Sequence, residues 1–372
     1  MCMLLRNEEA MSKKITIHYE EKPLYDITIE HSFAGLSAVL QELDLSQRRI
    51  CVVSDTNVAK HYLEEVRSIA GENAKEVYTF TFPAGEQSKN TDTVGDLYKV
   101  LIEAHFDRKD ILLALGGGVV GDLTGFAAST YLRGIRVVQI PTSLLSMVDS
   151  SIGGKTGVDF RGYKNMVGAF FQPSAVYMNL STLKTLSDAQ YFSGFGEIIK
   201  HGLIKDAAYF QSICEHLDAL KVRDMNALEE IVAGSCQIKR SVVEKDPKEK
   251  GERALLNYGH TLGHAIEKLM DFSLLHGECV SLGTIAASKL SLNRNMITKV
   301  QFENIVSLLR QLCLPVTVSN ISAQEIINIS KNDKKMDAGQ IRFILLNTIG
   351  EAIITTDVTD QEMTEALEEI LC

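Results

Sequence analysis

The chain has 372 residues, of which 45% are hydrophobic and 23% charged, so it is long enough for two domains with separate apolar cores. This composition excludes an intrinsically disordered chain and a small disulfide scaffold. With 38 Lys and Arg against 48 Asp and Glu, the formal net charge is −10, which argues against general electrostatic binding to nucleic acid or to an anionic membrane. Local basic residues must therefore hold any anionic ligand.

The cysteines and the N-terminus predict a soluble, cytoplasmic protein. The 7 cysteines are scattered and include no Cys-x-x-Cys pair, as is usual in a reducing compartment. The first residues carry acids directly after a short apolar patch, unlike a signal peptide, and no apolar run reaches the about 18 residues of a membrane span. We expect residues 1–14 to form a loose tail, with Met11 as an alternative start.

The first half of the chain predicts a Rossmann-like α/β domain with a parallel sheet, over residues 15–183. Short β-branched runs alternate there with longer amphipathic stretches, as in strands joined by crossover helices. The predicted strands are Ile50–Val53, Val77–Phe82, Ile111–Leu115, Ile135–Ile140 and Ala175–Leu180. The predicted helices span 57–70 and 93–104.

The second half predicts a mostly α-helical domain, over residues 184–372. Beyond Ser187 the apolar period becomes helical. The helical stretches are 227–243, 255–270 and 280–292. Residues 341–356 are an exception, because they predict two short strands that turn at Ile349-Gly350.

A glycine-rich turn follows the predicted strand Ile111–Leu115. The run Gly116-Gly117-Gly118-Val119-Val120-Gly121-Asp122 leads from an apolar strand into a helix, where free backbone N–H groups and the helix dipole can receive a pyrophosphate. The spacing is not the strict G-x-G-x-x-G, so a tight turn without a ligand is the alternative. Three consecutive glycines favour the phosphate-binding interpretation.

Polar residues also follow the two earlier predicted strands. Asp55 and Asn57 follow the first, where a carboxylate can bind ribose hydroxyls, although an Asp at a helix start is equally explained as an N-cap. The segment Ala84-Gly85-Glu86-Gln87-Ser88-Lys89 follows the second and is by itself only a polar loop. Neither signal is decisive alone.

Residue types that bind metals gather in the second half. His260 and His264 lie at i and i+4 of a predicted helix, and His276 opens the following helix. Glu197 is a natural carboxylate donor, and a catalytic divalent metal takes about three protein ligands with one open position. Spacing alone nominates His260 with His264. The alternative is that these histidines are hydrogen-bonded core or cap residues.

Basic side chains near glycines or amides form a third set. They are Arg133, Lys155, Lys164, Lys200, Lys239, Arg253, Lys334 and Lys335. In an acidic protein such residues are more often solvated surface. Lys155 and Lys164 are favoured as anion ligands, because each is expected in a loop beside glycine. Asp149 adds an acceptor for a substrate hydroxyl.

Taken together, these motifs resemble the 3-dehydroquinate synthases, the shikimate-pathway members of the sugar phosphate cyclase family. The resemblance runs from about Val52 to Gly350. The motifs that carry it are Gly85-Glu86-Gln87, Gly116-Gly117-Gly118-Val119-Val120-Gly121-Asp122-Leu123, Met147-Val148-Asp149-Ser150-Ser151-Ile152-Gly153-Gly154-Lys155-Thr156, Lys164-Asn165, Glu197-Ile198-Ile199-Lys200, Asn257-Tyr258-Gly259-His260, His276-Gly277-Glu278 and Asp333-Lys334-Lys335. One departure is Gly196, which precedes Glu197 where alanine is common in the family.

The resemblance implies NAD⁺ and a zinc or cobalt ion as cofactors. It implies that Glu197, His260 and His276 bind the metal while His264 faces the substrate, against the spacing argument. The implied NAD⁺ contacts are Asp55, Asn57, Ala84, Gly85, Glu86, Gln87, Ser88, Lys89, Gly116, Gly117, Gly118, Val119, Val120, Gly121, Asp122, Thr142, Ser143, Lys155, Lys164, Thr182, Leu183, Lys184 and Thr185.

The resemblance also implies a carbon–oxygen lyase whose substrate is 3-deoxy-D-arabino-heptulosonate 7-phosphate. Oxidation, phosphate elimination, re-reduction, ring opening and an internal aldol closure would give 3-dehydroquinate. The implied catalytic contacts are Asp149, Lys155, Lys200, Lys239, Glu249, Arg253, Asn257 and His264. The implied phosphate contacts are Asn165, Lys334, Lys335 and Arg133, the last reaching the neighbouring subunit of a homodimer.

Three other functions remain as alternatives. A sister cyclase would close an aminocyclitol or valiolone ring, but Lys239, Arg253 and Asn257 favour a substrate with a carboxylate. A metal-dependent alcohol or glycerol dehydrogenase would release NADH, and Glu197 with the phosphate-type cations argues against it. A binding or regulatory protein on an inactive enzyme scaffold is disfavoured, because no expected ligand or catalytic position is lost.

Overall fold

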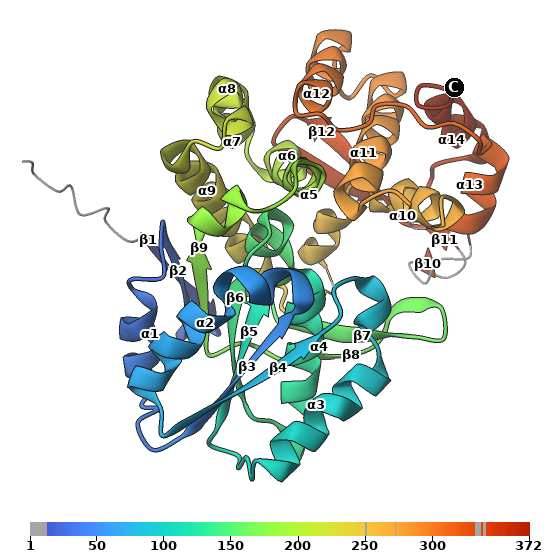
Figure 1. The fold of residues 1–372 in the computed structure, drawn as a ribbon. Coiled ribbons are helices and arrows are strands. Elements are labelled where there is room, and N and C mark those ends of the chain that lie inside the picture. The colour runs from blue at the N-terminus through green and yellow to red at the C-terminus, as the bar shows by residue number, and fades with distance from the viewer. Residues whose placement is uncertain (1–12, 250, 272, 332–335, 338–339) are drawn as a thin grey trace, which may run out of the picture. The chain divides into compact units, whose positions relative to one another are not determined.

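The computed structural model describes residues 13–249, 251–271, 273–331, 336–337 and 340–372. The chain divides into two compact units (Figure 1). The first unit comprises the described part of Met1–Thr142 together with Gly154–Thr182, and the second comprises Ser143–Gly153 together with the described part of Leu183–Cys372. None of the helices in the described ranges has the length and apolar character needed to cross a membrane.

The first unit is built on a seven-stranded sheet with the order β1-β2-β9-β6-β5-β3-β4. In this spatial order, every pair of neighbouring strands beyond β2 is parallel, and only β1 pairs antiparallel with β2. This arrangement confirms the predicted α/β class and all five predicted strands. The strand bounds are β1 Lys13–Tyr19, β2 Lys22–Glu30, β3 Arg49–Asp55, β4 Glu76–Phe82, β5 Ile111–Gly116, β6 Arg136–Pro141 and β9 Ala175–Asn179.

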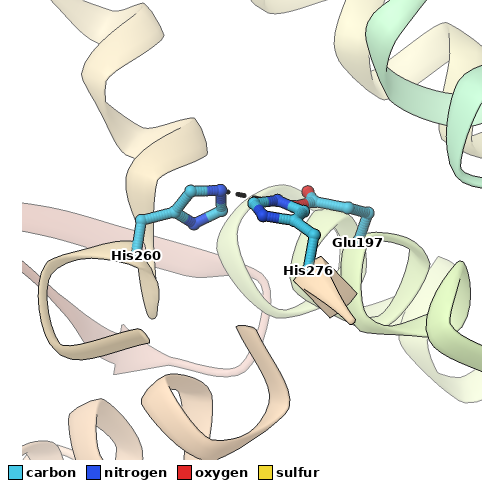
Figure 2. Close-up of side chains that lie close together, drawn as sticks. All are labelled: Glu197, His260 and His276. Atoms are coloured by element: carbon cyan, nitrogen blue, oxygen red, sulfur yellow. Dashed lines mark hydrogen bonds and ion pairs between the residues drawn. The ribbon is translucent and has the colours of Figure 1, made fainter. Parts of the chain in front are cut away.

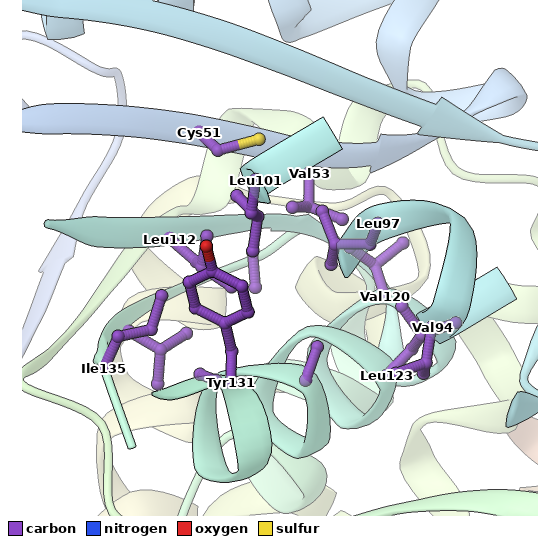
Figure 3. Close-up of a cluster of buried hydrophobic side chains, with 14 of the residues drawn as sticks. Cys51, Val53, Val94, Leu97, Leu101, Leu112, Val120, Leu123, Tyr131 and Ile135 are labelled. Carbon is purple, nitrogen blue, oxygen red and sulfur yellow. The ribbon is translucent and has the colours of Figure 1, made fainter. Parts of the chain in front are cut away.

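Helices cover both faces of this sheet. They are α1 Leu36–Glu42, α2 Thr56–Asn73, α3 Thr91–Glu103 and α4 Gly118–Thr130, with short helical turns η1 Glu86–Ser88 and η2 Tyr131–Arg133. Successive residues of β5 point to opposite faces: Leu112 lies in the core beneath α3 and α4 (Figure 3), whereas Leu113 lies in the core beneath α1 and α2. Burial on both faces explains why the strands β3, β5, β6 and β9 are continuous apolar runs.

Two hairpins of the first unit were not predicted. The first joins β1 to β2. Lys13 and Lys14 already belong to β1, so the predicted loose tail over residues 1–14 is wrong for its last two residues. The other hairpin joins β7 Lys155–Phe160 to β8 Tyr163–Phe170, so the expectation that Lys155 and Lys164 lie in loops is also wrong. Gly157 pairs with Gly168, because a side chain at either position would approach the backbone of the partner strand. Glycines weaken the sequence pattern of a strand, so this hairpin was not recognised.

The second unit is mostly helical, as predicted. Its α-helices are α5 Asp188–Ser193, α6 Phe195–Lys205, α7 Ala207–Glu215, α8 Leu217–Lys221, α9 Met225–Lys245, α10 His260–Leu269, α11 His276–Asn293, α12 Lys299–Gln311, α13 Ala323–Ser330 and α14 Asp360–Leu367. Its shorter elements are η3 Ser146–Ser150, η5 Glu252–Asn257, β10 Met336–Asp337, β11 Gln340–Ile341, β12 Phe343–Thr348 and β13 Glu351–Thr355. The helical turn η4 Leu180–Lys184 contains the residues at which the chain passes from the first unit to the second. The predicted hairpin over 341–356 is present as β12 and β13, with Gly350 at φ +89° in the turn.

Two predicted boundaries differ from the structure. The single helix expected over 255–270 is η5 followed by α10, because Gly259 at φ +76° interrupts the helical backbone. The segment Ser143–Gly153 was expected within the domain 15–183, but it belongs with the second unit, where Met147 and Asp149 contact α9. Alternation of strands and helices cannot reveal such an exchange, since it reports local conformation only.

Candidate active site

The glycine-rich turn of the first unit connects β5 to α4. Gly117 is the N-cap of α4 and has no side chain to cap the first backbone N–H groups. None of Gly116, Gly117 and Gly118 has a positive φ, so the backbone conformation of the turn does not by itself require glycine at these positions. A Cβ at Gly116 would instead lie 2.4 Å from Val120, and one at Gly121 would lie 2.7 Å from Gln139. Close packing thus requires glycine at position 116, and the bare helix N-terminus suits an anionic group.

The other residues predicted to bind nucleotide in this unit follow neighbouring parallel strands. Asp55 ends β3 and caps α2, accepting from the N–H groups of Asn57 at 2.8 Å and Val58 at 3.0 Å. The segment from Ala84 to Lys89 follows β4, and the turn from Gly116 to Asp122 follows β5. Thr142 and Thr182 follow β6 and β9. Because these strands are adjacent and parallel, all of these residues lie at one edge of the sheet. Ser143, Leu183, Lys184 and Thr185 belong to the second unit.

Lys89 is the buried charge of this edge. Its ammonium lies 2.7 Å from Glu86, 3.6 Å from Asp122 and 3.8 Å from Asp159. Burial by itself lowers the pKa of Lys89, but these three carboxylates raise it above its ordinary value. Lys89 therefore stays charged and ties the polar loop to α4 and to β7.

The β7–β8 hairpin and η2 carry the other basic candidates of the first unit. Lys155 begins β7, and Lys164 and Asn165 lie in β8. Asn165 adopts φ +54°, and its N–H donates to Asp159 at 2.9 Å. Arg133 lies in η2 at φ +69°.

In the second unit, three predicted metal ligands meet at one point (Figure 2). Glu197 lies on α6 and is fully buried, while His260 and His276 are the first residues of α10 and α11. Glu197 Oε1 lies 3.3 Å from His260 Nε2 and 3.3 Å from His276 Nε2. Ligands about 2.0–2.1 Å from a tetrahedral zinc ion are separated by roughly 3.3 Å, so the spacing of these donors fits a divalent metal.

Neighbouring groups orient both imidazoles. His260 Nδ1 lies 3.0 Å from the carbonyl oxygen of Tyr258 and donates to it, which leaves Nε2 as the free lone pair. Glu267 Oε2 lies 3.8 Å from His276 Nδ1, so this carboxylate acts on the second ring through its charge. Groups of this kind fix the tautomer and orientation of metal-binding histidines.

The charges of the cluster are strongly coupled. Burial raises the pKa of Glu197, but Lys200 holds it well below its usual range. Burial, followed by Lys200, lowers the pKa of His260 to about 3, so this ring is neutral. Burial also lowers the pKa of His276, but Glu197 and Glu267 raise it to about 9. A metal at this site would therefore displace a proton from His276.

Small residues let the helices approach closely enough to form the cluster. A Cβ at Gly196 would lie 2.5 Å from the carbonyl oxygen of Gly277, and one at Gly277 would lie 1.7 Å from the carbonyl oxygen of Ser193. Only glycine fits at either position, which explains the departure at Gly196. This close packing brings the N-terminus of α11, and with it His276, against α6.

The pair nominated by spacing is arranged differently. The rings of His260 and His264 have centroids 5.0 Å apart. Within the described ranges, the ligand atoms of His264 group with Glu267 and His276, not with His260. His260 instead groups with Glu197 and His276, so the prediction from i, i+4 spacing is wrong. Glu267 carries no sequence signal that singled it out.

Three of the basic residues predicted to bind anions are buried in the second unit, so they are not solvated surface residues. They are Lys200, Lys239 and Arg253. Lys200 pairs with Glu197, and Lys239 pairs with Asp149. Burial raises the pKa of Asp149, but Lys239 lowers it well below its usual range, and burial lowers the pKa of Lys239.

Arg253 is 2% exposed and donates to the carbonyl oxygens of Pro247 at 2.8 Å and Gly153 at 3.2 Å. Asn257 donates to Glu249 at 2.9 Å. Lys334 and Lys335 lie outside the described residues.

An α/β unit with a glycine-rich strand-to-helix turn, together with a helical unit in which a glutamate and two histidines converge, fits the class of enzymes that bind NAD⁺ and a divalent metal. Solved structures support this class. The chain matches 2-deoxy-scyllo-inosose synthase complexed with carbaglucose-6-phosphate, NAD⁺ and Co²⁺, with a TM-score of 0.86, 25% identity and coverage of 97% of this chain and 100% of that one. It matches 2-epi-5-epi-valiolone synthase from Streptomyces hygroscopicus with NAD⁺ and Zn²⁺ bound, with a TM-score of 0.86, 28% identity and coverage of 95% and 98%.

The sequence assigns a branch within this class. Residues 79–193 match the 3-dehydroquinate synthase N-terminal model, and residues 194–336 match the C-terminal model. The chain is 43% identical to 3-dehydroquinate synthase of Acetivibrio thermocellus, over 94% of this chain and 97% of that protein. It is 42% identical to 3-dehydroquinate synthase of Hydrogenovibrio crunogenus, over 96% and 99%. The chain belongs to the 3-dehydroquinate synthase family.

Proposed function

We propose that this chain is a 3-dehydroquinate synthase of the shikimate pathway, which converts 3-deoxy-D-arabino-heptulosonate 7-phosphate into 3-dehydroquinate and phosphate with NAD⁺ and zinc or cobalt as cofactors. The observation that carries the proposal is the convergence of Glu197, His260 and His276 at the separation of metal ligands, in a chain of this family. Bound metal would polarise a substrate hydroxyl, and bound NAD⁺ would accept one hydride and return it.

The nucleotide would lie on the sheet edge of the first unit. The uncapped N–H groups of α4 would bind its pyrophosphate, and Asp55, Glu86 and Lys89 would bind its polar groups. Asp55 already accepts two backbone N–H groups, so its capping role keeps the carboxylate in one orientation.

Buried cations of the second unit would bind the substrate carboxylate. Two carbonyl oxygens hold the guanidinium of Arg253, so its fork is oriented before substrate arrives. Lys239 would supply a second positive charge, and Asp149 beside it would accept a hydrogen bond from a substrate hydroxyl. Lys200, paired with Glu197, and Glu249, paired with Asn257, would complete the hydroxyl-binding groups.

The substrate phosphate would be held by Lys155, Asn165, Asn257, His264 and one of Lys334 or Lys335. A fixed phosphate favours elimination, because the leaving group keeps one orientation. The cation and amide donors also explain how an acidic protein binds a doubly anionic substrate.

We also propose a cytoplasmic homodimer in which Arg133 reaches the phosphate of the neighbouring subunit. Leu132 and Arg133 are consecutive non-glycine residues with positive φ, a conformation that costs roughly 1–3 kcal/mol each and persists mainly at functional positions. Exposed apolar side chains lie on this loop and on the β7–β8 hairpin. They are Leu132, Phe160, Tyr163, Met166 and Phe170. Sedimentation of the wild type should give a dimer, and Tyr163→Asp should shift it toward monomer; a wild-type monomer would contradict this assembly.

A phosphate-release assay tests the reaction. Metal-loaded protein with the heptulosonate 7-phosphate and catalytic NAD⁺ should release phosphate without net NADH absorbance, and protein treated with EDTA should not. Turnover on sedoheptulose 7-phosphate instead would assign a sister cyclase. Steady NADH accumulation on a simple polyol would assign a dehydrogenase. Retained metal with no turnover would favour a binding protein.

A further inference from the structure

The second unit contains a buried imidazole outside the set of predicted metal and substrate residues. His201 lies on α6, four positions after Glu197, so both side chains lie on one face of the helix. His201 is fully buried. Its Nδ1 lies 2.6 Å from the hydroxyl oxygen of Ser235 on α9.

Two ion pairs flank this ring, the first fully buried and the second with its carboxylate 30% exposed. Glu197 pairs with Lys200, and Asp149 pairs with Lys239 one turn beyond Ser235 on α9. Burial, followed by Lys200, lowers the pKa of His201 to about 3, so the ring is neutral. Each of the two ion pairs has no net charge, and a neutral His201 adds a polar group without adding a charge.

The second ring nitrogen has unmet hydrogen-bonding capacity. Among the described residues, no group forms a hydrogen bond with Nε2 of His201, although this atom is buried. A neutral imidazole has one donor and one acceptor nitrogen, and buried polar atoms almost always have a partner, from the protein or from ordered water. The carboxylates of Asp149 and Glu197 beside the ring offer only acceptor oxygens, which favours the tautomer in which Nε2 carries the proton and Nδ1 accepts from Ser235.

The neighbouring carboxylates define that acceptor. One ring nitrogen of His201 and one carboxylate oxygen each from Asp149 and Glu197 lie within 4.8 Å of one another. A water molecule with hydrogen bonds of about 2.8 Å in tetrahedral directions joins atoms about 4.6 Å apart, so one water can bridge these three groups. The carboxylates are also each paired with a lysine, which argues against a second metal.

We infer that His201 is a positioning residue, whose Nε2–H holds an ordered water that bridges to Asp149 and Glu197 and keeps Oε1 of Glu197 directed at the two metal-binding histidines. The inference rests on the proposed metal centre. Outer groups of this kind typically change metal affinity about 10- to 100-fold. His201 thereby couples the Ser235 position on α9 to the ligand on α6.

Zinc affinity of chelator-stripped full-length protein tests the inference. His201→Leu, which has no donor, should bind zinc about 10- to 100-fold more weakly than wild type. His201→Gln keeps an N–H donor near the position of Nε2 and should restore affinity to within about 3-fold. Tyr191→Phe is the control, because it removes another buried hydroxyl of this unit, which donates to the carbonyl oxygen of Leu220 on α8 at 2.6 Å, and should lower thermal stability with zinc affinity unchanged. If His201→Leu does not fold, His201→Phe takes its place, since it keeps the ring volume without the donor.

Wild-type zinc affinity in the donor-free variant would overturn the inference. So would a His201→Gln variant as weak as His201→Leu, because packing rather than hydrogen bonding would then explain the loss. If wild-type protein binds two equivalents of zinc and His201→Leu binds one, His201 is a ligand of a second metal rather than a partner of a water. Wild-type protein that binds zinc without turnover would overturn the proposed reaction only, whereas wild-type protein without zinc affinity would overturn the metal centre and the role of His201 together.

Discussion

The two units of this protein prepare their binding groups in different ways. In the first unit the main features are backbone N–H groups at a helix start and glycines that let chain segments approach, all at the ends of parallel strands. In the second unit they are charged side chains buried between helices and balanced against one another. The comparison teaches that the first kind of site follows from local conformation, whereas the second depends on which helices pack together.

The largest effect is expected for Glu197→Ala. Removing a ligand from the three-donor cluster should lower zinc affinity more than about 100-fold, beyond the usual cost of losing an outer group, and abolish turnover. NAD⁺ affinity, which depends on the first unit, should change little. Glu303→Ala on the exposed face of α12 is the control. Full metal content in Glu197→Ala, measured by elemental analysis, would remove Glu197 from the ligand set.

For Gly116→Val we expect the opposite result, in which NAD⁺ affinity falls and zinc affinity does not change. The added side chain meets Val120, an overpacking that costs about 1–3 kcal/mol of unfolding free energy, and it displaces the start of α4. The displaced N-terminus of α4 should raise the dissociation constant of NAD⁺ about tenfold, which corresponds to about 1.4 kcal/mol of lost binding free energy, while zinc content stays at wild-type level. Gly71→Ala, at an exposed helical position with open space, should leave both unchanged. Unaltered NAD⁺ binding by calorimetry would contradict the assignment of this turn.

A more selective effect is expected for Arg253→Lys. The charge remains but the planar fork is lost, so KM for the heptulosonate should rise about 10- to 100-fold with zinc and NAD⁺ binding unchanged. Arg240→Lys, on the half-exposed side of α9, serves as the matched control. Unchanged kinetics in Arg253→Lys would show that Arg253 does not hold the carboxylate.

The smallest effect is expected at an ion-pair network that supports the second unit away from the cluster. Arg294 lies 2.7 Å from Glu362 and 2.7 Å from Asp357. The hydrogen bonds from Arg294 lower the pKa of Glu362 to about 2. A carboxylate with a lowered folded-state pKa contributes stability that is present above its unfolded pKa and is lost as the pH falls toward the folded value.

Arg294→Gln should therefore cost about 1 kcal/mol at pH 7, and the difference from wild type should shrink as the pH falls from about 5 toward 2. Thermal unfolding of both proteins across this pH range provides the measurement. Arg310→Gln controls for the loss of an exposed positive charge on a helix of the same unit. A difference that stays constant with pH would mean that Arg294 acts through packing instead.

Much of the fold was predictable, for reasons that differ between elements. The strands β3, β5, β6 and β9 are buried on both faces and therefore appear as uninterrupted apolar runs, whereas β4 ends the sheet and is only partly buried. The β7–β8 hairpin was missed because the glycines that allow its close pairing also weaken its strand signal. The helix over 255–270 was predicted too long, since the apolar period continues through Gly259 while its backbone does not.

The sequence by itself determined the α/β alternation, the helical second half and the glycine-rich turn after β5, because each depends on residues that are neighbours in the chain. Only the tertiary structure decided which donors meet. Spacing favoured His260 with His264, but Gly196 and Gly277 let α6 and α11 approach so closely that Glu197 and His276 join His260 instead. The exchange of Ser143–Gly153 into the second unit and the burial of Lys200, Lys239 and Arg253 have the same origin. Helix packing fixes these features, and no local pattern in the chain records it.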